Sequence, residues 1–163
     1  MKEIPRAARF GILALLTTVV ACSGGAPAAF TLNSASVDSP YACPANARNA
    51  PYAFQATIEV RNGTSSIVTI KSVAAQLTLA ATKGSWLQKV GSKFEAPTLS
   101  FSPGAVGAGS STSMQVTISS ACTGGGTAKV DPSYGDYSVE LTVVTLSGTH
   151  KIASKNRHRI VSG

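Results

Sequence analysis

Apolar and polar residues alternate strictly along several segments of the chain, the pattern of strands that bury one face. The clearest segment covers residues 54–61, where Phe, Ala, Ile and Val take every second position and Gln, Thr, Glu and Arg stand between them. Residues 114–119 and 137–143 repeat this alternation. The three segments predict three strands that face a common core.

A fourth strand is predicted over residues 68–79, and its apolar positions change phase along the way. Val68 and Ile70 set one parity, and the apolar residues from Val73 onward follow the other. A shift of this kind predicts a β-bulge or bend near Lys71 and Ser72.

Weaker patterns complete the strand list. Residues 30–37 predict a first strand, residues 86–101 hold one or two poorly defined strands, and a hairpin around Gly148 leads into a last strand over residues 152–160. The Asn62-Gly63-Thr64 sequence matches a glycosylation acceptor, but we interpret it as a type I′ hairpin turn. About seven strands without helical periodicity predict an all-β fold, an antiparallel immunoglobulin-like sandwich, over residues 30–163.

The N-terminal residues lack the alternating pattern of residues 30–163. Residues 1–9 are basic, residues 10–20 form an apolar run of 11 residues, and small residues follow. As a helix that run spans about 16 Å against roughly 30 Å of membrane hydrocarbon, too little for a transmembrane anchor. Residues 1–21 are therefore expected to be a signal peptide, and residues 22–29 a tether to the domain.

Val19-Val20-Ala21-Cys22 resembles the lipobox of bacterial lipoproteins. The resemblance implies cleavage before Cys22 and acylation of that residue, so that membrane lipid holds the protein in the bacterial cell envelope, facing the periplasm or the cell exterior. Several acyl chains give stable anchoring where one is marginal. The alternative is an ordinary signal peptide, cut nearby, with Cys22 present by chance.

Composition limits the classes of function. The chain has 163 residues, 14 Lys+Arg, 7 Asp+Glu and only 13% charged residues, which fits one strand-rich domain. Removal of residues 1–21 takes away three basic residues and one acid, leaving a net charge of +5. Outside a membrane this mild excess favours an envelope protein or an anionic polysaccharide as partner, and no nucleic acid is expected.

Cys43 and Cys122 are the two remaining cysteines of the exported chain, and in an oxidising compartment they predict a disulfide. Two cysteines without neighbouring histidines are too few for structural zinc. A reactive dithiol is the alternative, although the pair does not form a Cys-x-x-Cys motif. The bridge would close a loop of about 80 residues, worth roughly 4 to 5 kcal/mol at most.

Residues 131–143 resemble the F strand of immunoglobulin-like and polycystic-kidney-disease-type domains, in which a Gly-x-Tyr step enters an alternating strand. The resemblance implies that Tyr137 is a tyrosine corner, that Leu141 points inward, and that residues 146–149 form the F–G hairpin. Val139 stands where antibody domains have a cysteine. In this strand order the two cysteines fall in the A–B and E–F connections, which lie at the same end of the sandwich.

The residues offer little for catalysis or metal binding. Glu59 and Glu140 occupy outward strand positions, Asp131 and Asp136 lie in a turn without a dense calcium-binding pattern, and no Gly-x-Ser-x-Gly motif occurs. His150 and His158 are the only histidines, and a solvated edge strand is the simplest interpretation of the basic segment around His158. We expect a protein that is not an enzyme and has no metal or cofactor.

Two candidate contact regions remain. Trp86, the single tryptophan, lies among Lys83, Lys89 and Lys93, which suits a carbohydrate or cell-wall binding site if the ring is exposed, whereas a lone Trp is more often core. Arg157 and Arg159 belong to a basic C-terminal segment. The sequence therefore predicts a membrane-tethered, non-catalytic interaction or structural module of the envelope, with a carbohydrate or cell-wall binding module as the alternative.

Overall fold

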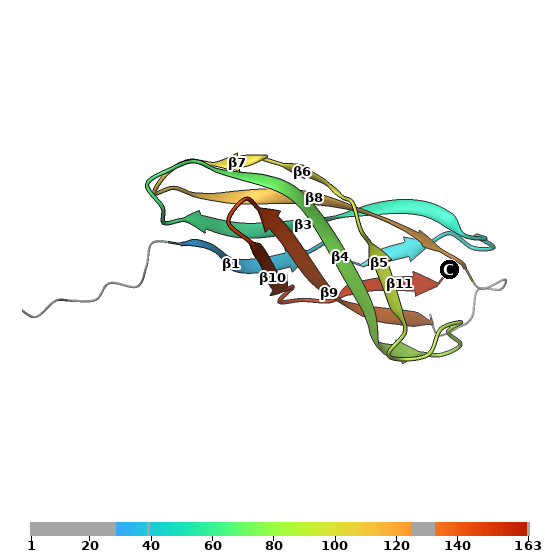
Figure 1. Cartoon of the computed structure of the whole chain (residues 1–163). Coiled ribbons are helices and arrows are strands. Elements are labelled where there is room, and N and C mark those ends of the chain that lie inside the picture. Colours follow the sequence, from blue (N-terminus) through green and yellow to red (C-terminus); the bar gives the residue numbers. More distant parts are fainter. Residues whose placement is uncertain (1–28, 39, 125–132, 163) are drawn as a thin grey trace, which may run out of the picture.

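A computed structural model describes residues 29–38, 40–124 and 133–162 (Figure 1). The predicted signal peptide, the lipobox with Cys22 and the loop residue Asp131 lie outside these ranges. Within them, no helix is long and apolar enough to cross a membrane. The described residues form eleven strands in two layers, so the predicted all-β sandwich is confirmed.

The first layer is an antiparallel four-stranded sheet in the order β1-β3-β8-β6. Its strands are β1 (Phe30–Val37), β3 (Ala50–Asn62), β8 (Ser111–Cys122) and β6 (Ser100–Ser102). Alternation explains the centre of this sheet, because Phe54, Ile58 and Val116 point to the core while the residues between them are more exposed.

The second layer has the order β2-β11-β9-β4-β5, and β10 and β7 pair with β9 and β4 beside this path. Its strands are β2 (Tyr41–Cys43), β11 (His158–Ser162), β9 (Tyr134–Thr145), β4 (Val68–Lys83), β5 (Lys93–Ala96), β10 (Thr149–Ala153) and β7 (Ala105–Val106). The strands β1, β3, β8 and β6 match the A-B-E-D sheet of an immunoglobulin-like fold, and β4, β9 and β10 match C-F-G.

The strand count exceeds the predicted seven because short strands extend both sheets. The predicted last strand, residues 152–160, is divided into β10 and β11, which pair with different parts of β9. The predicted bulge of β4 is confirmed, since its register with β9 shifts between Ile70 and Ser72. This shift lets Ile70 and Val73 share the buried face despite their different parity.

The predicted hairpin at Asn62-Gly63-Thr64 is wrong. β3 and β4 belong to different sheets, and neither Asn62 nor Gly63 has the positive φ that a type I′ turn requires. Instead the fully buried Asn62 side chain organises the crossing between sheets: its amide donates to the carbonyls of Ser66, Val106 and Gly107. The side chain is occupied internally and is no exposed glycosylation acceptor.

The disulfide between Cys43 and Cys122 is confirmed. It joins β2 to the last residue of β8, where Cys122 lies opposite Ala50, the first residue of β3. β3 ends at Asn62, next to Gly63, whose amide donates to the carbonyl of Ala29 at 2.9 Å. One strand thus spans the sandwich, from a disulfide end, which also carries the C-terminus, to an N-terminal end (Figure 1).

Candidate functional site

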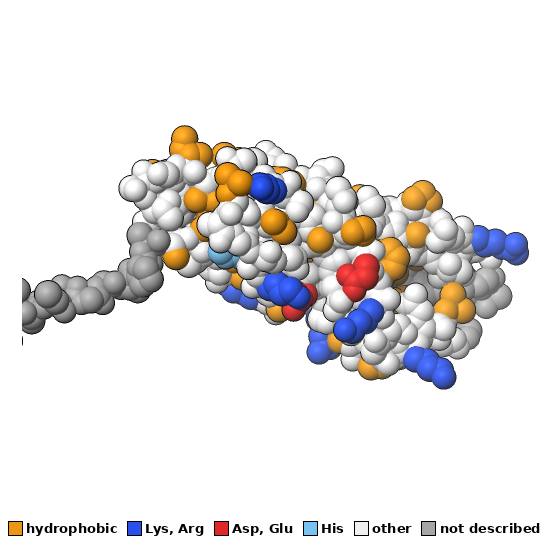
Figure 2. All heavy atoms as spheres, in the orientation of Figure 1, with side chains coloured by type: hydrophobic (Ala, Val, Ile, Leu, Met, Phe, Trp, Pro, Cys, Tyr) orange, Lys and Arg blue, Asp and Glu red, His pale blue; other side chains and the backbone are white. Residues whose placement is uncertain are grey.

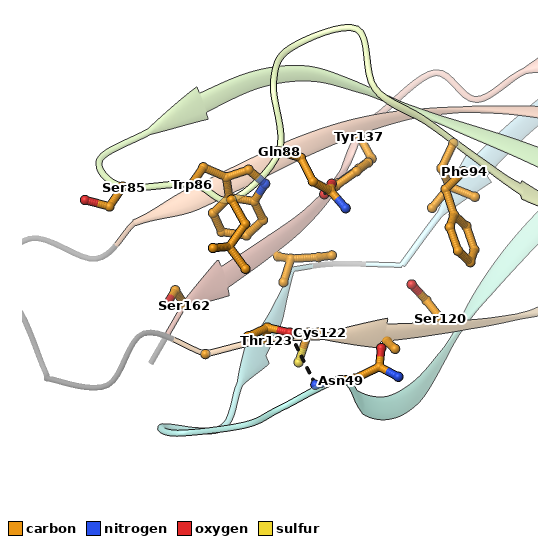
Figure 3. A pocket seen from close by; sticks show the side chains of 15 residues that line it. Asn49, Ser85, Trp86, Gln88, Phe94, Ser120, Cys122, Thr123, Tyr137 and Ser162 are labelled. Atoms are coloured by element: carbon orange, nitrogen blue, oxygen red, sulfur yellow. Dashed lines mark hydrogen bonds between the residues drawn. The ribbon is translucent and has the colours of Figure 1, made fainter.

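A cavity of about 400 Å³ opens at the disulfide end, between the two sheets. Trp86, Gln88 and Phe94, with Tyr137 of β9, line one wall, while Ser120 and Cys122 of β8 belong to the opposite one (Figure 3). Asn49 and Thr123 join that second wall, where the backbone N–H of Asn49 donates to Thr123 Oγ1 at 3.2 Å. A volume of this size with an apolar lining and a few polar groups is typical of small-ligand sites.

Trp86 is neither a free surface ring nor a fully buried one. It lies in the loop after β4, is half-buried, and packs against the hydrophobic core. The indole rests against the backbone of Gly135, where a Cβ atom would come within 2.5 Å of Trp86 Cε2. Packing therefore explains the glycine of the Gly-x-Tyr step, Gly135, since any larger residue would displace the indole ring.

Tyr137 connects this loop to the core. Its hydroxyl donates to Gln88 Oε1 at 2.6 Å, and burial raises the pKa of the phenol, although a hydrogen bond with Trp86 opposes this rise. A tyrosine corner bonds to the backbone a few positions upstream, whereas among the described residues the Tyr137 hydroxyl donates to a side chain 49 positions upstream, so these contacts do not form such a corner. It instead fixes the inner edge of the cavity. Leu141 is fully buried, as the resemblance implied.

The three lysines predicted to surround Trp86 do not enter the cavity. Lys83, Lys89 and Lys93 are exposed, and none of them lines it. Arg157 is exposed in the turn between β10 and β11. The predicted contact set thus separates into Trp86, which is part of the cavity wall, and exposed basic residues that do not line the cavity.

Arg159 has a structural partner. Its Nε and Nη2 donate to the two carboxylate oxygens of Asp136 at 2.6 and 2.9 Å, and its guanidinium lies 4.0 Å from the ring centroid of Tyr134. These hydrogen bonds hold the pKa of the Asp136 carboxyl below its usual value. The prediction of a turn at Asp136 is wrong, because this residue lies within β9, paired with Arg159 of β11. Its carboxylate forms an ion pair with Arg159, which opposes the calcium role considered for it. No cluster of three metal-ligating side chains occurs among the described residues.

His158 contradicts the expectation of a solvated basic edge. Its side chain is fully buried and stacks on Phe54 with 3.9 Å between ring centroids. Its Nε2 lies 3.1 Å from the Tyr52 hydroxyl. Burial lowers the pKa of the imidazole, and burial likewise raises the pKa of Tyr52 to about 12. The period of β11 predicts this inward position, because Ile160 two residues later is also buried.

Large apolar side chains are exposed at the two ends of the sandwich. Leu87 and Phe94 line the cavity, Val90 is exposed in the same loop as Leu87, and Leu87 is 82% exposed. Ile67 and Leu146, 70% and 76% exposed, lie in turns at the N-terminal end. These five are the large exposed hydrophobic residues of the described chain, and apolar patches at a surface often mark contact sites.

Comparison with known proteins assigns neither a family nor a function to this chain. The sequence matches no protein-family model and no curated protein. Among solved structures, the chain is similar to the ASH/PapD-like domain 7 of human CEP192, at 12% identity and a TM-score of 0.26 over 92% of this chain and 95% of that one. At these values the match says nothing about function.

Sequence patterns did not predict the cavity. Its walls come from segments far apart in the chain, around positions 49, 86, 94, 122, 137 and 160. Periodicity places the strands but not the loop of residues 84–92, from which Ser85, Trp86, Leu87 and Gln88 line the cavity. The one usable signal was the irregular segment around Trp86, in which a single aromatic ring lies outside any alternating strand.

Proposed function

We propose that the protein is a lipid-anchored, non-catalytic interaction module of the bacterial envelope, and that the disulfide end receives a protein partner. The observation that carries the proposal is the position of the cavity, at the opposite end of β3 from Ala29. The 13 residues of β3 correspond to about 40 Å at roughly 3.3 Å per residue. A domain tethered through Cys22 would therefore present this cavity away from its anchor.

The chemistry of the cavity favours a protein segment with an apolar or aromatic side chain. Leu87, which lines the cavity, is the most exposed large hydrophobic residue described, and Val90, three residues later in the same loop, is exposed as well. Gln88 and Ser120 supply polar groups within the cavity. Interfaces of this kind combine a buried anchor residue with a polar rim. Among the described residues that line the cavity there is no Asp or Glu.

Photocrosslinking in intact cells tests this proposal. A benzophenone amino acid at Leu87 should give a discrete adduct with one envelope protein, because this side chain borders the cavity and is open to solvent. The matched control places the same group at Ser119, an exposed position on the outer face of β8. Val90→Asp should abolish the Leu87 adduct. Adducts of equal pattern at both sites, unaffected by Val90→Asp, would contradict a partner at this end.

A carbohydrate or cell-wall glycan is the second candidate, favoured by three aromatic side chains, Trp86, Phe94 and Tyr137, in one cavity. Sugar rings bind to aromatic faces flanked by hydrogen-bonding groups, and Gln88 offers such a group. Because Trp86 is the single tryptophan, its emission reports on this site alone. A shift of that emission on titration with muropeptides or anionic polysaccharide supports the glycan, and an unmoved spectrum excludes Trp86 as its contact.

A further inference from the structure

The N-terminal end carries two exposed apolar side chains that the cavity does not explain. Ile67 is the last residue before β4, and Leu146 is the first residue after β9. β4 and β9 are neighbours, and the register pairs Ile70 with Thr145. Both side chains therefore lie just beyond the last pair of adjacent strands, on the same end of the domain.

Both turns are held by internal hydrogen bonds. Asn62 accepts from the Thr64 amide at 3.0 Å and donates to the Ser66 carbonyl at 2.8 Å, which fixes the turn before Ile67. In the other turn, the Thr145 amide donates to the Gly148 carbonyl at 2.9 Å. The two apolar side chains are thus presented on ordered turns, and little conformational entropy is lost when they become buried.

Charge at this end suits an anionic surface. Arg61, the penultimate residue of β3, and Lys71, in the bulge of β4, are both exposed. The nearest acid along β3 is Glu59, which accepts a hydrogen bond from Ser113. On the face shown in Figure 2, acidic side chains lie away from the end at which the described chain begins. Basic residues beside exposed apolar ones are typical of surfaces that bind anionic membranes.

The position of Ala29 indicates which surface the N-terminal end would contact. The Ala29 carbonyl accepts from the Gly63 amide at 2.9 Å, so the described chain begins beside the turn that carries Ile67. Seven residues, 22–28, precede Ala29, and they reach at most about 25 Å when extended. A bilayer that holds Cys22 is then the surface nearest to this end.

From these observations we propose that the N-terminal end contacts the bilayer directly, with Ile67 and Leu146 inserted among anionic headgroups. The inference rests on the lipid anchor of the proposed function and goes beyond it. An anchor alone leaves the domain free to tumble above the membrane, whereas this contact gives it one orientation. The cavity then faces away from the bilayer.

Depth-dependent quenching on the full acylated chain tests the contact. Leu146→Cys and, as matched control, Leu87→Cys each introduce one free thiol, because Cys43 and Cys122 are paired and Cys22 would be thioether-linked. Each variant receives an environment-sensitive fluorophore and is reconstituted on vesicles of phosphatidylethanolamine and phosphatidylglycerol. Lipids with a shallow nitroxide should quench the probe at position 146 severalfold more than the probe at 87.

The outcomes separate the contact from the anchor. Protein that floats with the vesicles while both probes remain equally unquenched overturns the contact and leaves the anchor standing. A chain that does not float contradicts the anchor, and with it this inference. Replacement of phosphatidylglycerol by phosphatidylcholine should weaken quenching at position 146, and unchanged quenching would overturn the role given to Arg61 and Lys71.

Discussion

Gly135 and Trp86 are in direct contact, the backbone of the first forming the surface on which the indole of the second rests. No side chain fits between them, since a Cβ at position 135 would lie 2.5 Å from Trp86 Cε2. This contact packs the start of β9 against the loop that forms the cavity wall. The hydrogen bond from the Tyr137 hydroxyl to Gln88 Oε1 joins the same two segments. The shape of the cavity depends on this contact.

Gly135→Ala should displace the indole and destabilise the fold. Overpacking of a well-packed site costs about 1 to 3 kcal/mol, and the emission of Trp86 should shift to the red as the ring is pushed toward solvent. Denaturant unfolding and intrinsic fluorescence measure both effects. Gly104→Ala is the control, because a Cβ there meets open space. Identical behaviour of the two variants would contradict the contact.

Asn62→Ala should be among the most damaging substitutions outside the apolar core. It removes an amide that donates to three carbonyls and an oxygen that accepts from the amide and hydroxyl of Thr64. Buried polar groups left without partners cost about 1 to 3 kcal/mol each, so we expect a loss of about 3 kcal/mol in urea unfolding. Asn33→Ala, at an exposed position of β1, should change stability little. Equal effects would show that burial of Asn62 is not decisive.

Removal of the disulfide should lower stability without abolishing the fold. Cys43→Ala combined with Cys122→Ala opens a loop of sequence separation 79, for which the chain-entropy model gives about 4 kcal/mol. Chemical unfolding with and without reductant provides the measurement. Reductant should destabilise the parent protein and leave the double variant unchanged. A parent protein insensitive to reductant in the unfolding transition would contradict the prediction.

The buried His158 predicts a loss of stability in mild acid. Burial lowers its pKa in the folded protein, while the unfolded chain takes up a proton near the ordinary value of 6.5. The unfolded state therefore binds more protons as pH falls below about 6.5, and the free energy of unfolding decreases from there down to the lowered pKa. Asp136 acts in a separate window: its stabilising pair with Arg159 is lost only as pH falls below the usual carboxyl value of 3.8.

Unfolding measured across this pH range, with two variants, checks the assignment. His158→Gln should flatten the decline that begins near pH 6.5, whatever its effect on overall stability. Tyr52→Phe removes the hydroxyl bonded to Nε2 but leaves the imidazole buried, so the decline should persist. A decline that survives His158→Gln would assign it to another group.

Local alternation was enough to place the long strands, because each buries one face against the opposite sheet. Phe54, Ile58 and Met114 are buried as their period demands, and even the bulge of β4 follows from the change of parity after Ile70. The disulfide was predictable because two cysteines remained and their connections meet at one end of an immunoglobulin-like sandwich.

Side-chain roles that depend on distant partners were not predictable. Asn62-Gly63 has the composition of a tight hairpin, but the Asn62 side chain bonds to residues of the β6–β8 region and turns the chain into the other sheet. In the sequence, His158 lies within a basic segment and is predicted to be solvated. The pairing of β11 with β9 places its side chain in the core instead. The cavity arises in the same way, from walls that meet only after both sheets have packed.

The opposite placement of Ala29 and the cavity along β3 has a mechanical consequence. In the proposed function, a pull from the anchor at Cys22 would enter the domain at Ala29, and a partner held near Cys122 would resist it, so that the force would run parallel to the strands. Ladder hydrogen bonds lie perpendicular to the strands, so the β1–β3 and β3–β8 pairs would bear this force in shear, with many bonds loaded together. Peeling would load them one at a time. If the proposed anchor and partner both hold, the domain should remain folded while it transmits tension between them.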